Sequence, residues 1–124
     1  MYESDSNSSK LVPPNREPDL SNKAVQREIE DLPETVRKQF FFSLQQVCQG
    51  WQPSLEQEKL HAAGKGVIEL KVPANRGPAY RCMYVIRKNG NVVVLHATSK
   101  TTKGQDKQLV ATTAERLKQL GADR

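Results

Sequence analysis

The strongest constraint on the fold is the stretch AYRCMYVIRKNGNVVVLHAT, residues 79–98, in which Asn89-Gly90 separates two β-rich runs. The two-residue turns of β-hairpins need positive φ angles, and Asn-Gly adopts them at low steric cost. The stretch therefore predicts an antiparallel hairpin. Its apolar face must be covered by other elements of the chain, because a two-stranded hairpin is not stable alone.

The register of this hairpin decides which side chains share a face. With Lys88 and Asn91 flanking the turn, the predicted pairs are Ile86 with Val93, Tyr84 with Leu95, Met83 with His96, and Arg81 with Thr98. Opposed residues share a face and successive residues alternate between faces. The apolar face then contains Cys82, Tyr84, Ile86, Val93, Leu95 and Ala97. On the other face Arg81 and His96 become diagonal neighbours.

Two amphipathic helices are predicted before the sheet. The stripe of the first contains Val25, Ile29 and Leu32, and the stripe of the second contains Val36, Phe40, Leu44 and Val47. This spacing is typical of helices that pack on a core, and the three phenylalanines at 40–42 are all interpreted as core. Asp31 is expected to cap the second helix, residues 34–49, with Pro33 tolerated in its first turn.

Residues 67–72, VIELKV, alternate apolar and polar side chains and predict a third strand. If Ile68, Leu70 and Val72 face the helices, Lys71 falls on the face of Arg81. Residues 51–66 are interpreted as a loop with one helical turn. A final helix is expected over residues 105–120.

These elements predict an α+β domain with a small antiparallel sheet packed on two N-terminal helices and a C-terminal helix. Residues 21–124 are expected to form this single domain. Residues 1–20, rich in serine, asparagine, proline and charge, are predicted to be a flexible N-terminal arm. The sheet face opposite the two helices is predicted to be the functional one.

Several classes of protein are disfavoured by the composition. The chain has neither a run of about 18 apolar residues nor a basic-then-apolar N-terminus, so no membrane association and a cytoplasmic location are expected. Its two cysteines, Cys48 and Cys82, stand singly and are expected to be reduced and buried. Without a Cys/His cage or a carboxylate cluster, no metal and no cofactor are expected.

Charge is unevenly distributed along the chain. Residues 1–34 carry eight acidic and four basic residues, whereas residues 35–124 carry 15 basic and six acidic ones. A basic body with an acidic front end suggests a polyanionic partner such as RNA or DNA. The alternative is that the lysines only keep the protein dispersed.

Three polar residues on the predicted functional face suit a phosphodiester. Arg81 and Lys71 could bind phosphate and stabilise charge in the transition state, and His96 could transfer protons near neutral pH. With RNA the attacking group can be the 2′-hydroxyl of the substrate, so no metal is needed. The alternative is a solvated basic face with a structural histidine.

The order of elements resembles the RelE/HigB superfamily of bacterial toxins, especially its phage-derived HigB-like branch. The stretches LPETVRKQFFFSLQQVCQG, GKGVIELKV and YRCMYVIRKNGNVVVLHATSK carry this resemblance over about residues 23–120. It implies the toxin of a type II toxin-antitoxin system. Such a toxin is a metal-independent endoribonuclease that cleaves mRNA on the ribosome and is held inactive by a cognate antitoxin, often a helix-turn-helix protein.

The resemblance also implies roles for individual residues. Arg81 matches the arginine of the YR motif and is expected to bind the scissile phosphate. Lys71 and Lys100 are expected to stabilise charge or carry protons, and His96 matches the histidine of the LH motif as a general acid or base. The residues expected to bind RNA are Lys65, Arg76, Arg87 and Lys103.

Two other functions remain open from the sequence. One is an RNA- or ribosome-binding module without catalysis. The other is a phage-derived regulator that acts on DNA together with its antitoxin partner. Cleavage of a message, binding without cleavage, and partner-dependent operator binding would separate the three.

Overall fold

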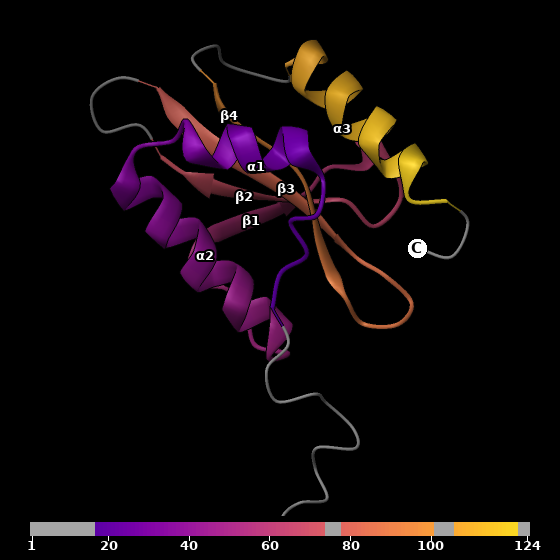
Figure 1. Cartoon of the computed structure of the whole chain (residues 1–124), viewed down its shortest axis with the longest axis horizontal. Helices are drawn as coiled ribbons and strands as arrows, with labels where there is room; N and C mark the ends of the chain where they lie inside the picture. The colour runs from indigo at the N-terminus through magenta and orange to yellow at the C-terminus, as the bar shows by residue number, and fades with distance from the viewer. Residues whose placement is uncertain (1–16, 74–77, 101–105, 122–124) are drawn as a thin grey trace, which may run out of the picture.

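A computed structural model of the chain describes residues 17–73, 78–100 and 106–121 (Figure 1). The elements in chain order are α1 (Lys23–Glu30), α2 (Glu34–Cys48), β1 (Glu56–Lys59), the 3₁₀ helix η2 (His61–Ala63), β2 (Ile68–Val72), β3 (Ala79–Ile86), β4 (Val92–Lys100) and α3 (Lys107–Gln119). The strands form one antiparallel sheet in the order β1-β2-β3-β4. The predicted α+β architecture is therefore confirmed.

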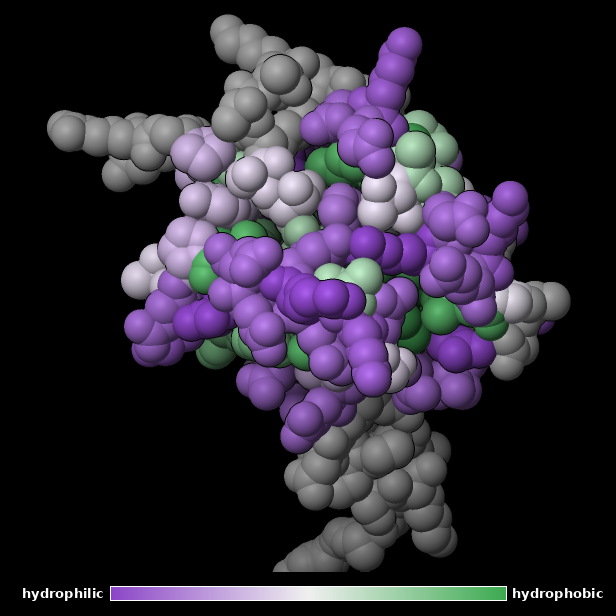
Figure 2. Space-filling model, turned by 45° about the horizontal axis from the view of Figure 1, so that its top comes forward, coloured by the Kyte–Doolittle hydropathy of each residue, from purple (hydrophilic) through white to green (hydrophobic). Residues whose placement is uncertain are grey.

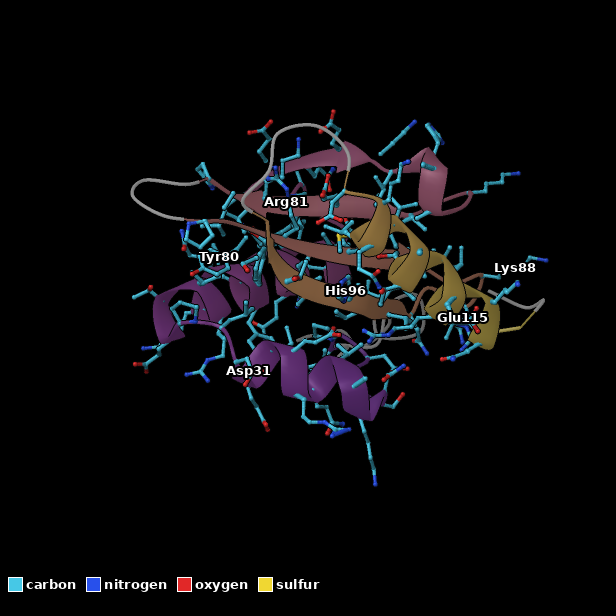
Figure 3. All side chains as sticks on the ribbon, turned by 90° about the horizontal axis from the view of Figure 1, so that it is seen from above. Asp31, Tyr80, Arg81, Lys88, His96 and Glu115 are labelled. Carbon is cyan, nitrogen blue, oxygen red and sulfur yellow. The ribbon has the colours of Figure 1, made fainter. Side chains whose placement is uncertain are left out.

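The sheet is covered on both faces. Helices α1 and α2 pack on one face, and α3 packs on the other, which Figure 3 shows as α1 and α2 below the sheet and α3 on the opposite side. Among the described residues, no helix is long and apolar enough to cross a membrane. On the face seen in Figure 2, hydrophilic side chains dominate, and apolar residues show only in small separate areas.

The core under α1 and α2 follows the predicted helical stripes. Phe40 and Leu44 are fully buried there and pack with Leu70 and Tyr84 of the sheet. The interpretation of all three phenylalanines as core was wrong, because Phe42 is 58% exposed. Three consecutive helical residues point in directions about 100° apart, so one core cannot receive all of them.

A second core lies under α3, on the face that was predicted to be open. Met83 and Val85 of β3 pack there with Leu95 of β4 and with Leu109 and Leu117 of α3. All five side chains are buried. The prediction of an open functional face is therefore wrong for the part of the sheet that α3 covers.

The hairpin register was predicted correctly only at the end far from the turn. Arg81 pairs with Thr98 and Met83 with His96, as predicted, but Tyr84 then pairs with Val94. The turn is one residue longer than predicted, because Arg87 and not Lys88 lies opposite Asn91. Leu95, the extra residue of a β-bulge, then restores the predicted register beyond it. One extra residue reverses the faces of all following positions in its strand.

Because of the bulge, Leu95 and the residues between it and the turn face the side of the sheet opposite to the one predicted. Val92 and Val94 join the core under α1 and α2, whereas Val93 and Leu95 lie under α3. Ile86, which was placed on the helix face, is 48% exposed. Ile86, Val93 and Leu95, which were expected on the face covered by the two N-terminal helices, are therefore not part of that core.

Strand β1 was missed from the sequence. Glu56 and Glu58 lie in it at the edge of the sheet, and all four of its residues are exposed. An exposed edge strand has no apolar alternation from which a pattern could predict it. The expected helical turn is present as η2, directly after β1.

The helix ends also differ from expectation at one point. Asp31 ends α1 as its C-cap, and α2 begins after Pro33 without a side-chain cap. The cap of α1 is Asn22, whose side-chain oxygen accepts hydrogen bonds from two backbone N–H groups of the first turn. The prediction that Asp31 caps α2 was wrong.

The opposite edge of the sheet, β4, is covered by the segment that leads into α1. Asp19 forms a parallel bridge with Val93, and its backbone bonds to Val92 and Val94. The predicted arm boundary at residue 20 falls just after this bridge. Residues 1–16 of the predicted arm lie outside the described part of the chain.

Candidate functional site

Two of the predicted catalytic cations are cross-strand neighbours. Lys71 on β2 pairs with Arg81 on β3, and Arg81 pairs in turn with Thr98 on β4. His96 lies two residues from Thr98 on the same strand, so it is diagonal to Arg81 as expected. The three adjacent strands therefore bring Lys71, Arg81 and His96 into one region of the sheet.

Both cations are paired with carboxylates of the protein itself. Arg81 Nε lies 3.3 Å from Glu69 Oε2, and both side chains are mostly buried, with exposures of 18% and 10%. Lys71 Nζ contacts Glu58 and lies 4.0 Å from Glu56. A phosphate that bound these cations would have to compete with three carboxylates.

His96 is buried where the edge of β4 meets two helices. Its Nδ1 lies 2.9 Å from Glu28 Oε1 of α1 and 3.4 Å from Arg116 Nη1 of α3. Figure 3 shows His96 between these two helices. The residue is 8% exposed, so its ring is held by the fold and is not a surface side chain.

Glu28 and Arg116 form a bidentate ion pair beside this histidine. Arg116 donates from Nη1 to Oε1 at 2.7 Å and from Nη2 to Oε2 at 2.8 Å. The backbone N–H of Ala97 donates to Oε1, and Arg116 also donates to the carbonyl of Leu95. The pair thus satisfies backbone groups at the outer edge of β4, next to the bulge.

The hydrogen bonds to Glu28 keep its carboxyl ionised. Burial alone would raise its pKa, but the hydrogen bonds from His96 and Arg116 outweigh burial. The charge of His96 and the N–H of Ala97 contribute in the same direction, and the pKa falls from 4.5 to about 2. At neutral pH the carboxylate of Glu28 is therefore negatively charged and lies beside the imidazole of His96.

Sequence reasoning missed both Glu28 and Arg116. They are 88 positions apart, on helices that cover opposite faces of the sheet. Glu28 directly precedes Ile29 on α1, and Arg116 directly precedes Leu117 on α3; both of these apolar residues are buried. A charged residue at the margin of a stripe is too common to identify a pair of this kind.

A groove of about 380 Å³ opens beside Glu28, between α1 and the ends of β3 and β4. Its lining includes Glu28, Asp31, Tyr80, Thr98 and Ser99. Two carboxylates in the lining make it unsuitable for phosphate, because like charges repel. The groove is therefore not the phosphate site that the sequence predicted.

Of the remaining predicted site residues in the described part of the chain, Lys65 and Arg87 lie away from Arg81, whereas Lys100 is its diagonal neighbour by register. Lys65 and Arg87 lie at the hairpin end of the sheet, beyond the Ile68–Tyr84 pair, whereas Lys71 and Arg81 lie near the other end. Lys100 ends β4 opposite Ala79. Arg76 and Lys103 lie outside the described residues.

In the described part of the chain, neither Cys82 nor a group of metal-binding side chains forms a second candidate site. Burial, with a smaller effect of the Glu28 charge, raises the pKa of the Cys82 thiol to about 12. Within residues 17–73, 78–100 and 106–121, no group of three His, Cys, Asp or Glu residues could hold a metal ion. The buried cysteine therefore behaves as a small apolar side chain.

Comparison with known proteins identifies one family. The family described as "Phage derived protein Gp49-like (DUF891)" matches residues 27–118. The matched region runs from α1 to α3 and includes Glu28, Lys71, Arg81, His96 and Arg116. Comparison with curated proteins gives no match.

Proposed function

Because the chain belongs to the phage-derived Gp49-like family, we propose that it is the toxin of a type II toxin-antitoxin pair that cleaves mRNA on the ribosome. The observation that carries this proposal is the arrangement of Lys71, Arg81 and His96 on three adjacent strands. Two cations can stabilise the charge that develops on a phosphate, and one imidazole can transfer a proton, without a metal. The resemblance to the RelE/HigB toxins supports the same activity.

The proposed reaction uses the 2′-hydroxyl of the message as nucleophile. Its oxygen attacks the adjacent phosphorus, the bond from phosphorus to the 5′-oxygen breaks, and a 2′,3′-cyclic phosphate and a 5′-hydroxyl result. The proton lost by the 2′-hydroxyl is balanced by the proton gained at the 5′-oxygen. His96 transfers one of these protons, and Arg81 with Lys71 neutralises the charge that develops on the phosphate.

The carboxylates around the cations set a condition on substrate binding. Arg81 has Glu69 at 3.3 Å, and Lys71 contacts Glu58. The scissile phosphate must therefore replace these ion pairs or join them from the exposed side. We propose that the ribosome supplies this binding energy by holding the message in place. Isolated RNA would have to displace the carboxylates with the binding energy of its own contacts.

The other proposed partners follow from the same activity. A toxin of this kind acts in the cytoplasm and needs an antitoxin, which we propose is a helix-turn-helix protein. Lys100 is proposed to act with Lys71 on the developing charge or as a proton carrier. Lys65 and Arg87 at the hairpin end of the sheet, with Arg76 and Lys103, are proposed to bind RNA backbone. Such contacts are electrostatic and lose strength as salt concentration rises.

The test is an in vitro translation reaction on a defined message with cut positions mapped by primer extension. The reaction is run with wild type and with Arg81→Ala, each with and without ribosomes. Cuts that require ribosomes and disappear with Arg81→Ala support the proposal. Lys118→Ala is the matched control, because Lys118 is an exposed cation on α3. An uncut message, with folded wild-type protein, would refute it.

A second function is favoured by the ion pair between Glu69 and Arg81. If this pair persists when RNA binds, the chain is a ribosome- or RNA-binding protein without catalysis. Sedimentation of the protein with ribosomes, together with intact message in the same reaction, would support this second function. Loss of both cleavage and ribosome binding in Arg81→Ala would instead support the first.

A further inference from the structure

The imidazole of His96 has two ring nitrogens in different surroundings. Nδ1 lies 2.9 Å from Glu28 Oε1. Nε2 has no hydrogen-bond partner among the described residues, and it is not one of their buried polar atoms left without a partner. Nε2 is therefore the ring nitrogen that these contacts leave available for another partner.

The position of the proton on the neutral ring follows from the contacts of Nδ1. A carboxylate can only accept a hydrogen bond, so the 2.9 Å contact with Glu28 requires a proton on Nδ1. The other tautomer would place two lone pairs against each other at this distance. Arg116 Nη1, at 3.4 Å from Nδ1, already donates to Glu28 and to Leu95.

The orientation of Glu28 is itself fixed from two sides. The guanidinium of Arg116 holds both carboxylate oxygens, and the N–H of Ala97 holds Oε1 from the strand. The carboxylate therefore cannot rotate away from the ring without losing three hydrogen bonds. Arg81, the diagonal neighbour of His96 on β3, is paired with Glu69 and does not compete for Glu28.

From this geometry we propose that Glu28 is a positioning residue that holds His96 as the Nδ1–H tautomer and leaves Nε2 as the nitrogen that exchanges protons with substrate. The proposal rests on the proposed function for its catalytic consequence. A carboxylate that orients a catalytic imidazole in this way fixes its tautomer and stabilises the imidazolium that forms. Arg116 acts one step further out, because it orients Glu28.

A purely structural role for the same contacts makes different predictions. In that case Glu28, His96 and Arg116 only join α1, β4 and α3, and any variant that weakens the junction would lower activity in proportion to stability. The substitution Arg116→Gln removes the bidentate ion pair but leaves Glu28 beside Nδ1. The substitution Glu28→Gln removes the negative charge that specifies the tautomer.

The first measurement is the tautomer of His96 in the full chain, by long-range ¹H–¹⁵N NMR at a pH where the ring is neutral. Only two histidines, His61 and His96, contribute signals, and His61→Gln assigns them. We expect a proton on Nδ1 in wild type and in Arg116→Gln. Protonation of Nε2 in wild type overturns the proposal, whatever the activity.

The second measurement is ribosome-dependent cleavage by the same proteins. Glu28→Gln is expected to lower kcat by about 10- to 100-fold, with a mixture of tautomers at His96. Glu30→Gln, the same change at an exposed position of α1, is expected to change neither. Equal losses in Glu28→Gln and Arg116→Gln, with an unchanged tautomer in both, would overturn the positioning role.

The two proposals fail separately. If wild type leaves the message intact, the proposed function fails, and the NMR result still decides whether Glu28 holds the Nδ1–H tautomer. If wild type cleaves but Glu28→Gln cleaves equally well, the positioning role fails and the proposed function stands. Should Glu28→Gln not fold, the wild-type tautomer alone still carries the test.

Discussion

The carboxylate of Glu69 lies 3.3 Å from Nε of Arg81 on the neighbouring strand, and both side chains are mostly buried. The arginine that the sequence predicts as the phosphate ligand therefore already has an anionic partner. A phosphate that bound Arg81 would have to compete with this contact.

The first prediction concerns the charge of Glu69. Glu69→Gln removes the competing charge without changing the size of the side chain, so RNA affinity at low salt should rise about three- to tenfold, which corresponds to roughly 0.7 to 1.4 kcal/mol. The salt dependence of binding should become steeper, because one more phosphate contact is formed. Fluorescence anisotropy with a short single-stranded RNA measures both quantities.

Glu115→Gln is the control for this prediction, because Glu115 is an exposed carboxylate on α3. It removes the same charge from the protein at a position away from Arg81. Equal gains in affinity for the two variants would mean that overall charge, and not the release of Arg81, controls RNA binding.

The second prediction concerns acid stability. The pKa of Glu28 is about 2 in the folded chain, lowered from 4.5. A carboxyl with a lowered folded-state pKa stabilises the fold above its unfolded pKa, and this contribution is lost as pH falls from 4.5 towards 2. The free energy of unfolding of Glu28→Gln should be about 1 to 3 kcal/mol lower than wild type at neutral pH.

The difference between the two proteins should shrink as pH falls through this range. Urea unfolding at neutral pH, near pH 4.5 and near pH 2 measures it. A difference that stays constant across these conditions would show that Glu28 does not contribute through its charge.

The third prediction compares Phe40 and Phe42, which lie two positions apart on α2. Phe40 is fully buried, whereas Phe42 is 58% exposed. Phe40→Ala should lower the free energy of unfolding by about 3 to 5 kcal/mol, because it removes buried apolar atoms and leaves a cavity. Phe42→Ala should change it by no more than about 0.5 kcal/mol. Thermal or urea unfolding separates the two, and similar losses would contradict the orientation of α2.

The fourth prediction tests the β-bulge. Leu95, the extra residue of β4, is 2% exposed and packs under α3, whereas Ile86 is 48% exposed. Leu95→Ala should lower the free energy of unfolding by about 2 to 5 kcal/mol. Ile86→Ala should cost much less, because little of its surface is removed from water.

The uninterrupted register would place Leu95 under α1 and α2, whereas the bulged one places it under α3 with Leu117. Leu95→Ala and Leu117→Ala should therefore be coupled in urea unfolding of the single and double variants, and additive losses would favour the uninterrupted register.

Much of the fold could be predicted from the sequence because it depends on local periodicity and turn preference. Helix α2 was predicted at residues 34–49 and is observed at Glu34–Cys48. The strand with Leu70 and Val72 faces the two helices as expected. The hairpin between β3 and β4 was predicted from the Asn-Gly turn, and its pairing of Arg81 with Thr98 agrees with the prediction because the bulge at Leu95 offsets a turn one residue longer than predicted. Each of these features depends on residues close together in sequence, where periodicity and turn preference act.

The candidate site could be read only in part. Arg81 and His96 were recognised because they lie on neighbouring strands of one hairpin, and Lys71 followed from the alternation of the next strand. Their carboxylate partners were not recognised as partners. Glu58 lies in an exposed edge strand without a pattern, and Glu28 reaches His96 from a helix 68 positions away.

By itself, the sequence determined the helices, the presence of the hairpin, the faces of β2 and the presence of cationic residues beside a histidine, because these follow from spacing and local preference. Only the tertiary structure decided that α3 covers the second face, that Leu95 bulges, and that Glu28 and Arg116 hold His96. These depend on how elements far apart in the chain pack together. A buried charge without a partner costs free energy, so these side chains pair with the opposite charges that the fold brings close, whatever their distance in sequence.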